Sequence, residues 1–388
     1  MKNQNSKLFK RLKSSAAPCC VALTVIIGAC NADGNRNNGD TTLISSDSLA
    51  NAESVQIKPS GPKPQWAPDI KPEMQAVIEK LASYNDKPTP ELTPQEARKN
   101  HTPTDAVMDL IKENNIQIPP STVDTAGREI PVKGGNIHIR IYTPKGEGPF
   151  PVIVYYHGGG FVIADLDVYD ASANSLAQQT SAVVVSVAYR LGPENKFPVA
   201  HDDSFAAYEW VVKNTASING NFKMIAVAGE SAGGNLAMNM AIMARDKGII
   251  QPVHILCVYP IAQSDTNTPS YIKNATAKPL SKPMMQWFNK HYLNNIAEAK
   301  DPRISLVMAN LKALPPTTII TAGIDPLQSD GMMLEEKLKA AGVEVQSKNY
   351  VGVTHEFFGM AAIVPEAKDA QAYAVSQLKK AFDNVKKK

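Results

Sequence analysis

Residues 224–238 read MIAVAGESAGGNLAM, and this stretch decides the fold. Its first five residues are continuously apolar, which is typical of a strand buried on both faces of a sheet. Gly229, Ser231 and Gly233 then form the pattern G-x-S-x-G, followed by an apolar run that suits a helix. In such a nucleophile elbow a sharp turn presents the serine hydroxyl at the end of the strand. The turn has no room for bulky residues on either side of the serine, which explains Gly229 and Gly233. We predict that Ser231 is the nucleophile.

The chain on both sides of this turn alternates apolar strands with helices. Four more runs have the same continuously apolar character: residues 152–156, 182–187, 254–259 and 317–321. Residues 137–142 alternate apolar and polar side chains, as a half-buried antiparallel strand does. Residues 343–350 are expected to form the last strand, and residues 367–385 a closing helix. The predicted fold class is therefore α/β, with a mostly parallel sheet flanked by helices.

Two helical segments stand outside this alternation. The first covers about residues 66–125, where apolar side chains at 74, 77, 78 and 81 share a helix face and residues 93–96 form a capping box. The second, residues 262–312, separates two strands and carries large side chains at helical spacing. We expect both segments to form a lid. The large side chains either line an acyl pocket or pack in the core; they are Met284, Trp287, Phe288 and His291.

A serine hydroxyl needs an adjacent base to become a good nucleophile. In proteins with a nucleophile elbow, the chain order is serine, acid, histidine. Three histidines follow the serine: His254, His291 and His355. His254 begins a predicted buried strand and His291 lies in the lid, whereas His355 comes directly after the last strand. We therefore predict His355 as the general base.

The base needs a carboxylate that fixes its tautomer and stabilises the imidazolium. Asp325 comes just after the predicted strand at residues 317–321, so it emerges at the same sheet edge as the serine. Asp330, five residues later, is the alternative.

An oxyanion needs preorganised donors, and the backbone N–H of Ala232 is one candidate. The loop at residues 157–161, HGGGF, follows an early strand and is expected to supply the others. Its three glycines, from Gly158 onward, let the backbone approach a substrate oxygen closely. We expect His157 to brace this loop rather than to transfer protons.

Together these motifs resemble those of the bacterial hormone-sensitive-lipase-like esterases, family IV of the lipolytic enzymes in the α/β-hydrolase superfamily. The shared pieces are HGGG at 157–160, YRLGPE at 189–194, GESAGG at 229–234, DPL at 325–327 and the loop at His355. The similarity covers about residues 70–385. It implies an α/β-hydrolase fold with a helical lid from the N-terminal helices and an insertion before the acid strand. It also implies that Gly159 and Gly160 join Ala232 as oxyanion donors.

The chain departs from the family at positions outside the predicted triad. Gly192 stands where alanine is usual, His201 where leucine is common, and residues 328–329 replace a charged pair. Five polar side chains are expected to form a structural brace near the oxyanion loop: Tyr189, Arg190, Glu194, Asp202 and Asp203.

The first 29 residues have the features of an export signal. Five basic and no acidic side chains precede an apolar stretch at residues 16–29, which is short for a bilayer span. An N-terminal membrane anchor is the alternative. Residues 27–30, IGAC, resemble the lipobox of bacterial lipoproteins, which implies that Cys30 is lipidated and begins the mature chain. Because Asn31 rather than aspartate follows, we expect an exported protein held at the outer membrane rather than the inner one.

Removal of this signal changes the charge of the chain. Subtracting its five basic residues from 40 leaves 35 against 37 acidic ones, a formal charge of −2. Nothing in this balance favours nucleic acid. Cys257 would be the one cysteine left besides Cys30, so we expect no disulfide and a small buried side chain. Residues 30–65, rich in Asn, Asp, Ser, Gly and Thr, are expected to be a flexible tether before a catalytic domain at 66–388.

Three functions are compatible with these residues. The first is a carboxylesterase that needs no cofactor, and the resemblance implies that it acts on short to medium acyl esters. The second is a binding module on the same fold, which the presence of all three triad members disfavours. The third keeps the mechanism but acts on acetylated glycans or amides. His355-Glu356 is not H-E-x-x-H, and no metal, phosphate or dinucleotide motif is expected. No feature predicts an oligomeric state.

Overall fold

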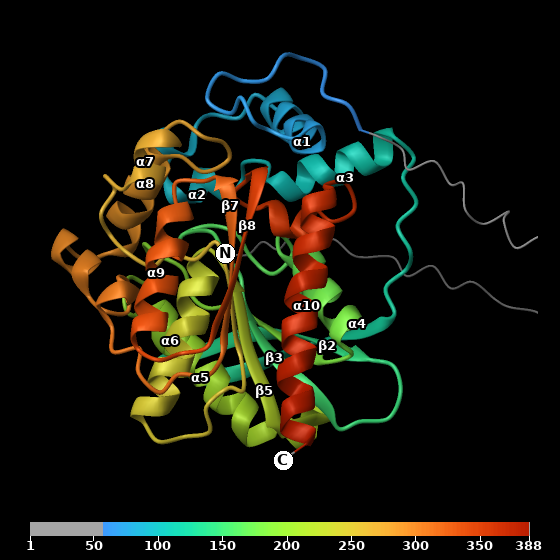
Figure 1. Ribbon diagram of the computed structural model, residues 1–388, viewed down its shortest axis with the longest axis vertical. Coiled ribbons are helices and arrows are strands. Elements are labelled where there is room, and N and C mark those ends of the chain that lie inside the picture. The colour runs from blue at the N-terminus through green and yellow to red at the C-terminus, as the bar shows by residue number, and fades with distance from the viewer. Residues whose placement is uncertain (1–56, 388) are drawn as a thin grey trace, which may run out of the picture. The chain divides into compact units, whose positions relative to one another are not determined.

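The computed structural model describes residues 57–387, in which helices cover both faces of one eight-stranded sheet (Figure 1). The strands are β1 Val123–Val132, β2 Gly135–Pro144, β3 Phe150–Tyr156, β4 Val183–Val187, β5 Gly220–Glu230, β6 Ile255–Val258, β7 Thr317–Ile324 and β8 Val345–Thr354. Their order across the sheet is β1-β2-β4-β3-β5-β6-β7-β8. β2 is antiparallel to both of its neighbours, and every pair from β4 to β8 is parallel. The predicted α/β-hydrolase architecture is confirmed.

Two layers of helices enclose the sheet. The helices α4 Asp170–Thr180 and α10 Pro365–Lys386 pack on one face, and α5 Val199–Asn214, α6 Ala232–Asp246 and α9 Gln328–Ala340 pack on the other. All residues of β4 and β6 are buried, as expected for strands covered on both sides. Because the central strands are parallel, their carboxyl ends meet at one edge of the sheet.

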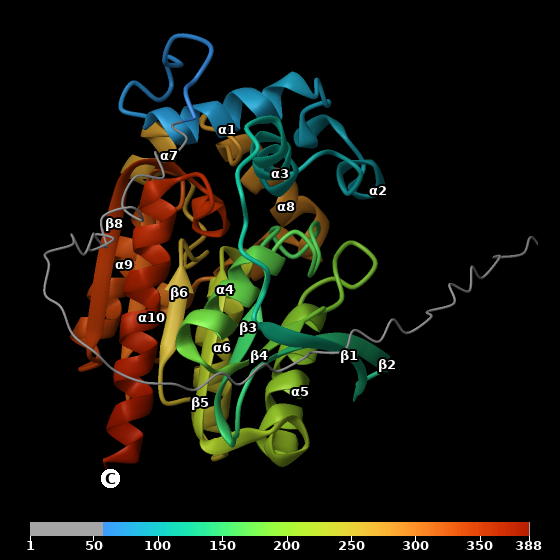
Figure 2. The same cartoon turned by 90° about the vertical axis from the view of Figure 1, so that its right-hand side faces the viewer.

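The two lid segments lie over that edge (Figure 2). The first contains α1 Pro72–Ser83, η2 Thr89–Glu91, α2 Pro94–Ala97 and α3 Pro103–Glu113, and the second contains α7 Pro269–Lys273, α8 Lys282–Tyr292, η4 Ile296–Lys300 and η5 Leu306–Met308. The predicted capping box of α2 is present, although this helix is only four residues long. The indole N–H of Trp287 donates to the carbonyl of Leu92 at 2.9 Å, which joins the two segments. Two further short helices are η3 Thr215–Ile218 and η6 Phe357–Met360.

The structure differs from the predicted organisation in two places. Strand β1 was not expected, and it begins at Val123, close to the predicted end of the first lid segment at about residue 125. Only Val123 and Ile130 of its ten residues are buried, so it lacks the apolar pattern of the other strands. The predicted tether also ends too late, because Ile57 is buried and the Ser60 hydroxyl donates to Glu79 on α1 at 2.7 Å. Residues 57–65 therefore pack on the catalytic domain.

The predicted signal peptide, Cys30 and the first part of the tether lie outside the described residues. Among residues 57–387, none of the helices is both apolar and long enough to cross a bilayer.

Candidate active site

The elbow places Ser231 between the end of β5 and the first turn of α6. Its backbone has φ 56° and ψ −118°, a conformation that is costly for a residue with a side chain. A Cβ added at position 229 would lie 2.1 Å from the carbonyl oxygen of Gly233, and one at 233 would lie 1.9 Å from that of Tyr156. Both glycines are therefore required by close backbone contacts, as the motif predicts.

Ser231, His355 and Asp325 form one hydrogen-bonded line at the carboxyl edge of the sheet. His355 Nε2 lies 2.9 Å from Ser231 Oγ, and His355 Nδ1 lies 2.7 Å from Asp325 Oδ2. The other carboxylate oxygen of Asp325 accepts the backbone N–H of Leu327 at 2.8 Å, which fixes the carboxylate. All three side chains are buried. When Nδ1–H donates to the carboxylate, Nε2 is free to accept the serine proton.

The charge around His355 favours its protonated form. Burial acts to lower the pKa of the imidazole, but the attraction and hydrogen bond of Asp325 outweigh it, with smaller contributions from Glu356 and Glu230. The pKa of His355 is therefore raised. This arrangement can take a proton from a hydroxyl group and hold it.

Asp330, the alternative acid, and His254, an alternative base, both bond to residues outside the triad. Asp330 is buried beneath the second lid segment, where it accepts the Gln263 side-chain amide at 2.7 Å and the Ala262 N–H at 3.1 Å. Burial raises the pKa of Asp330 to about 7. His254 is buried with its Nε2 2.9 Å from the Thr318 hydroxyl. Asp325 is thus the acid that the geometry selects.

The glycine loop after β3 presents backbone N–H groups beside Ser231. Gly159 and Gly160 have φ values of 96° and 59°, in the left-handed region that favours glycine. A Cβ at 159 would lie 2.1 Å from the Ile163 carbonyl oxygen, and one at 160 would lie 2.3 Å from the ring of Phe288. Neither N–H donates a hydrogen bond to another of the residues that the structure describes. Both glycines and Ser231 line the same pocket.

A stacked pair of rings supports this loop from below. The imidazole of His157 stacks on Tyr189 with centroids 4.3 Å apart, and the Tyr189 hydroxyl donates to the His157 carbonyl at 2.8 Å. Burial lowers the pKa of His157 to about 4, so the ring is neutral at pH 7. Arg190 forms a bidentate ion pair with buried Asp203, in which Nε lies 2.7 Å from Oδ2 and Nη2 lies 2.6 Å from Oδ1. These contacts agree with a bracing role.

Arg98, directly after α2, links the lid to the oxyanion loop. Its guanidinium donates to the carbonyls of Val162 at 2.9 Å and Gly192 at 2.7 Å, and it pairs with Glu194 at 2.8 Å. The hydrogen bonds from Arg98 lower the pKa of Glu194 to about 2. Asp202, expected in the same network, is exposed and makes no side-chain hydrogen bond to the described residues. The sequence prediction missed the role of Arg98.

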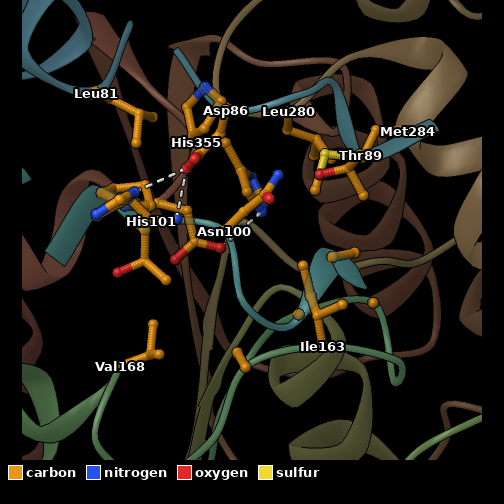
Figure 3. Close-up of a pocket in the computed structure, with 18 of the residues that line it drawn as sticks. Leu81, Asp86, Thr89, Asn100, His101, Ile163, Val168, Leu280, Met284 and His355 are labelled. Atoms are coloured by element: carbon orange, nitrogen blue, oxygen red, sulfur yellow. Dashed lines mark hydrogen bonds and ion pairs between the residues drawn. The ribbon is translucent and has the colours of Figure 1, made fainter. Parts of the chain in front are cut away.

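The pocket above Ser231 and His355 has a volume of about 340 Å³ (Figure 3). Apolar side chains from both lid segments and from the loop after β3 line it, among them Leu81, Ile163, Leu280, Met284 and Phe288. Of the four large side chains for which both roles were open, Met284 and Phe288 line the pocket, Trp287 is buried in the core and His291 does not line the pocket.

A polar pair on the lid was not predicted from the sequence. His101 Nδ1 lies 3.0 Å from Asp86 Oδ2, and Asn100 beside them donates to the carbonyl of Lys87 at 2.8 Å (Figure 3). These residues line the outer part of the pocket. Among the residues that the structure describes, no cluster of His, Cys, Asp and Glu is arranged to hold a metal ion.

Comparison with known proteins places this geometry in a family. The profile of the alpha/beta hydrolase fold family matches residues 153–359. A carboxylesterase of Mycobacterium tuberculosis, NlhH, is 39% identical over 252 residues, which cover 64% of this chain and 79% of that protein. An ethyl acetate hydrolase of Pseudomonas putida is 31% identical over 250 residues, covering 63% and 79%.

Solved structures give the same result. A hyperthermophilic esterase from Pyrobaculum calidifontis superposes with a TM-score of 0.74 at 34% identity, and the match covers 80% of this chain and 98% of that one. The chain therefore belongs to the alpha/beta hydrolase fold family, and by class it is a serine carboxylesterase.

Proposed function

We propose that this carboxylesterase hydrolyses short- to medium-chain esters through an acyl-enzyme on Ser231. The observation that carries the proposal is the unbroken line of hydrogen bonds from Ser231 Oγ through His355 to Asp325, at 2.9 and 2.7 Å. This line ends in the pocket, beside the glycine loop that supplies free N–H groups.

In the acylation step, Ser231 Oγ attacks the ester carbonyl carbon while its proton moves to His355 Nε2. The developing oxyanion is held by the backbone N–H groups of Gly159, Gly160 and Ala232. Asp325 stabilises the imidazolium. His355 then returns the proton to the departing alkoxide, so that the alcohol leaves and the acyl group stays on Ser231.

In the deacylation step, water attacks the acyl carbonyl and His355 takes its proton. The bond between the acyl carbon and Ser231 Oγ breaks as the serine regains a proton from His355. The carboxylic acid leaves, and the enzyme returns to its first state. No cofactor takes part in this cycle.

The size of the pocket supports small substrates. A volume of about 340 Å³ is shared between acyl and alcohol groups, and it lies at the lower end of the usual range for small-molecule sites. Phe288 and Met284 line it, and the ring of Phe288 lies close to Gly160 of the oxyanion loop. The P. putida relative is named for a short ester.

The proposal is tested with purified protein and p-nitrophenyl butyrate. We expect turnover by the wild type and, for Ser231→Ala, a decrease of about 10⁴-fold or more. Unchanged turnover by Ser231→Ala would refute the proposal. The same assay with acetylated sugars and aryl amides compares the proposed esterase activity with the deacetylase and amidase alternatives.

We propose separately that the enzyme is exported and anchored in the cell envelope by a lipid on Cys30, with the outer membrane as its location. The basic start, the short apolar stretch and IGAC at residues 27–30 support this. Growth with a radioactive fatty acid should label the wild type but not Cys30→Ser. Equal labelling of both proteins would contradict the anchor.

A further inference from the structure

Glu356, the residue after His355, faces the reacting atoms but has no part in the triad. Its backbone has φ 71° and ψ 2°, the left-handed region, which is unfavourable for a residue with a side chain. Such strain persists where the surrounding structure holds it, and it gathers at functional sites. The side chain of Glu356 lines the pocket together with Ser231 and His355.

A hydrogen bond from Tyr169 holds the carboxylate of Glu356 near His355. Its Oε1 accepts the hydroxyl of Tyr169 at 2.6 Å and lies 3.8 Å from His355 Nε2. Nε2 is the same atom that contacts Ser231 Oγ. A separation of 3.8 Å is too long for a direct hydrogen bond, but one water molecule can bond to both atoms.

A neighbouring carboxylate gives a useful contrast. Glu230, the residue before Ser231, is fully enclosed, and its two oxygens accept the hydroxyls of Tyr155 and Tyr259. Glu230 therefore supports the elbow from inside the core. Glu356 is anchored on one side only and faces the pocket on the other.

Glu356 also adjoins a second cavity. This cavity of about 210 Å³ lies between α3, α4 and η6, and Tyr169 and Glu356 line both it and the catalytic pocket. The buried hydroxyl of Ser172 adds a polar group to its wall. Polar partners of this kind are what a bound water requires.

We propose that Glu356 holds the water molecule that hydrolyses the acyl-enzyme, and that Tyr169 fixes the carboxylate for this task. The inference rests on the proposed acyl-enzyme mechanism. The water donates one hydrogen to Glu356 Oε1 and the other to His355 Nε2, which leaves a lone pair directed at the acyl carbon. As the new C–O bond forms, the second proton passes to Nε2. The bond to Ser231 Oγ then breaks, and the proton moves from Nε2 to Oγ.

This role makes a kinetic prediction that a general electrostatic role does not. Because p-nitrophenolate is a good leaving group, we expect deacylation to limit kcat for p-nitrophenyl acetate, whereas kcat/KM depends only on binding and acylation. A residue that orients the hydrolytic water affects kcat and KM together and leaves kcat/KM unchanged. A carboxylate that merely stabilises the imidazolium affects both steps, so kcat and kcat/KM fall together.

The experiment compares stopped-flow and steady-state hydrolysis of p-nitrophenyl acetate by the full chain and its variants. For Glu356→Ala we expect kcat to fall about 10- to 100-fold and KM to fall by the same factor. Tyr169→Phe should show the same pattern with a smaller decrease. Glu113→Gln, which neutralises an exposed glutamate at the end of α3, is the matched control for loss of charge.

The size of the p-nitrophenol burst counts the working active sites, so a poorly folded fraction does not distort the result. If Glu356→Ala does not fold, the isosteric Glu356→Gln replaces it, with a smaller decrease of the same kind. Equal decreases in kcat and kcat/KM, or a kcat within twofold of the wild type, would overturn the inference. A wild type with no burst, and no acetyl group on Ser231 after acid quenching, would contradict the proposed function instead.

Discussion

The sheet edge and the lid are built in different ways. At the sheet edge, Ser231, Asp325 and His355 each follow a strand end, and backbone hydrogen bonds of the sheet fix their positions. In the lid, single side chains reach across the chain, as when Trp287 bonds to the carbonyl of Leu92, 195 positions away. The difference indicates that the chemistry is encoded locally, whereas the pocket that selects substrates depends on long-range contacts.

The largest expected effect contrasts two buried aspartates on the same segment. Asp325→Asn should lower kcat about 10³- to 10⁴-fold, because an amide cannot fix the tautomer of His355 or stabilise its charge. Asp330→Asn should lower kcat less than tenfold and reduce the thermal stability instead, because Asp330 holds the insertion at residues 262–263. Assays with p-nitrophenyl butyrate and thermal melts separate the two. Equal losses of kcat would show that the acid is assigned to the wrong residue.

Gly160 lies where the sheet edge meets the lid, and Gly160→Ala should lower kcat about 100-fold. The new methyl group would collide with Phe288 of α8 and strain a positive φ, which displaces an oxyanion donor. Adding Phe288→Ala should restore part of the loss, because it removes the collision but not the strain. If kcat of Gly160→Ala alone were within threefold of the wild-type value, the placement of this loop would be contradicted.

The pH dependence tests the electrostatics of the sheet edge. The reaction needs neutral His355, whose pKa is raised above 6.5, so kcat/KM should fall about tenfold per pH unit below that pKa. The midpoint of this acid limb should lie above pH 6.5, and Asp325→Asn should move it lower. A midpoint well below pH 6.5 in the wild type would contradict the charge balance.

The same shift has a consequence for stability. Because the folded state binds the His355 proton more tightly than the unfolded chain, the stabilising contribution is complete below about pH 6.5. It is lost as the pH rises through the pKa of the folded state. Thermal melts of the wild type and His355→Gln across this range should therefore converge toward higher pH.

The smallest expected effect concerns the contact between the lid and the oxyanion loop. Arg98→Ala should lower kcat/KM about three- to tenfold, because the carbonyls of Val162 and Gly192 lose their donor. Glu194→Gln keeps those two bonds and weakens only a partly exposed ion pair, worth about 1 kcal/mol or less. It should change kcat/KM less than twofold. If the two variants behave alike, the ion pair rather than the carbonyl contacts holds the lid.

The parts of the sheet that could be predicted are those with an apolar signal. Residues 224–228 and 317–321 were identified because every side chain there is apolar or β-branched. Strand β5 extends beyond the first run at both ends, and strand β7 extends beyond the second run at its C-terminal end. Strand β1 was missed because most of its side chains are exposed and its apolar residues do not alternate regularly with polar ones. It is held by pairing with β2 at all ten positions, which no local pattern reveals.

The candidate site divides in the same way. Ser231, His355 and the glycine loop could be predicted because motif and chain order are properties of the sequence. Asp325 was also predicted, from its place directly after a strand, and it contacts His355, whereas the alternative Asp330 bonds to residues 262–263. Glu356 and Arg98 could not be assigned, because their partners come from α4 and from the loop after β3. The adjacency of Glu356 to His355 was the available signal.

Covalent labelling of the nucleophile tests the central conclusion most directly. A p-nitrophenyl alkylphosphonate should transfer one phosphonyl group to Ser231, found by mass spectrometry of the digested protein, with activity lost in proportion to the label. Ser231→Ala should remain unlabelled. A group found on another residue, or full activity with Ser231 completely labelled, would contradict the account of this enzyme as a Ser231 esterase.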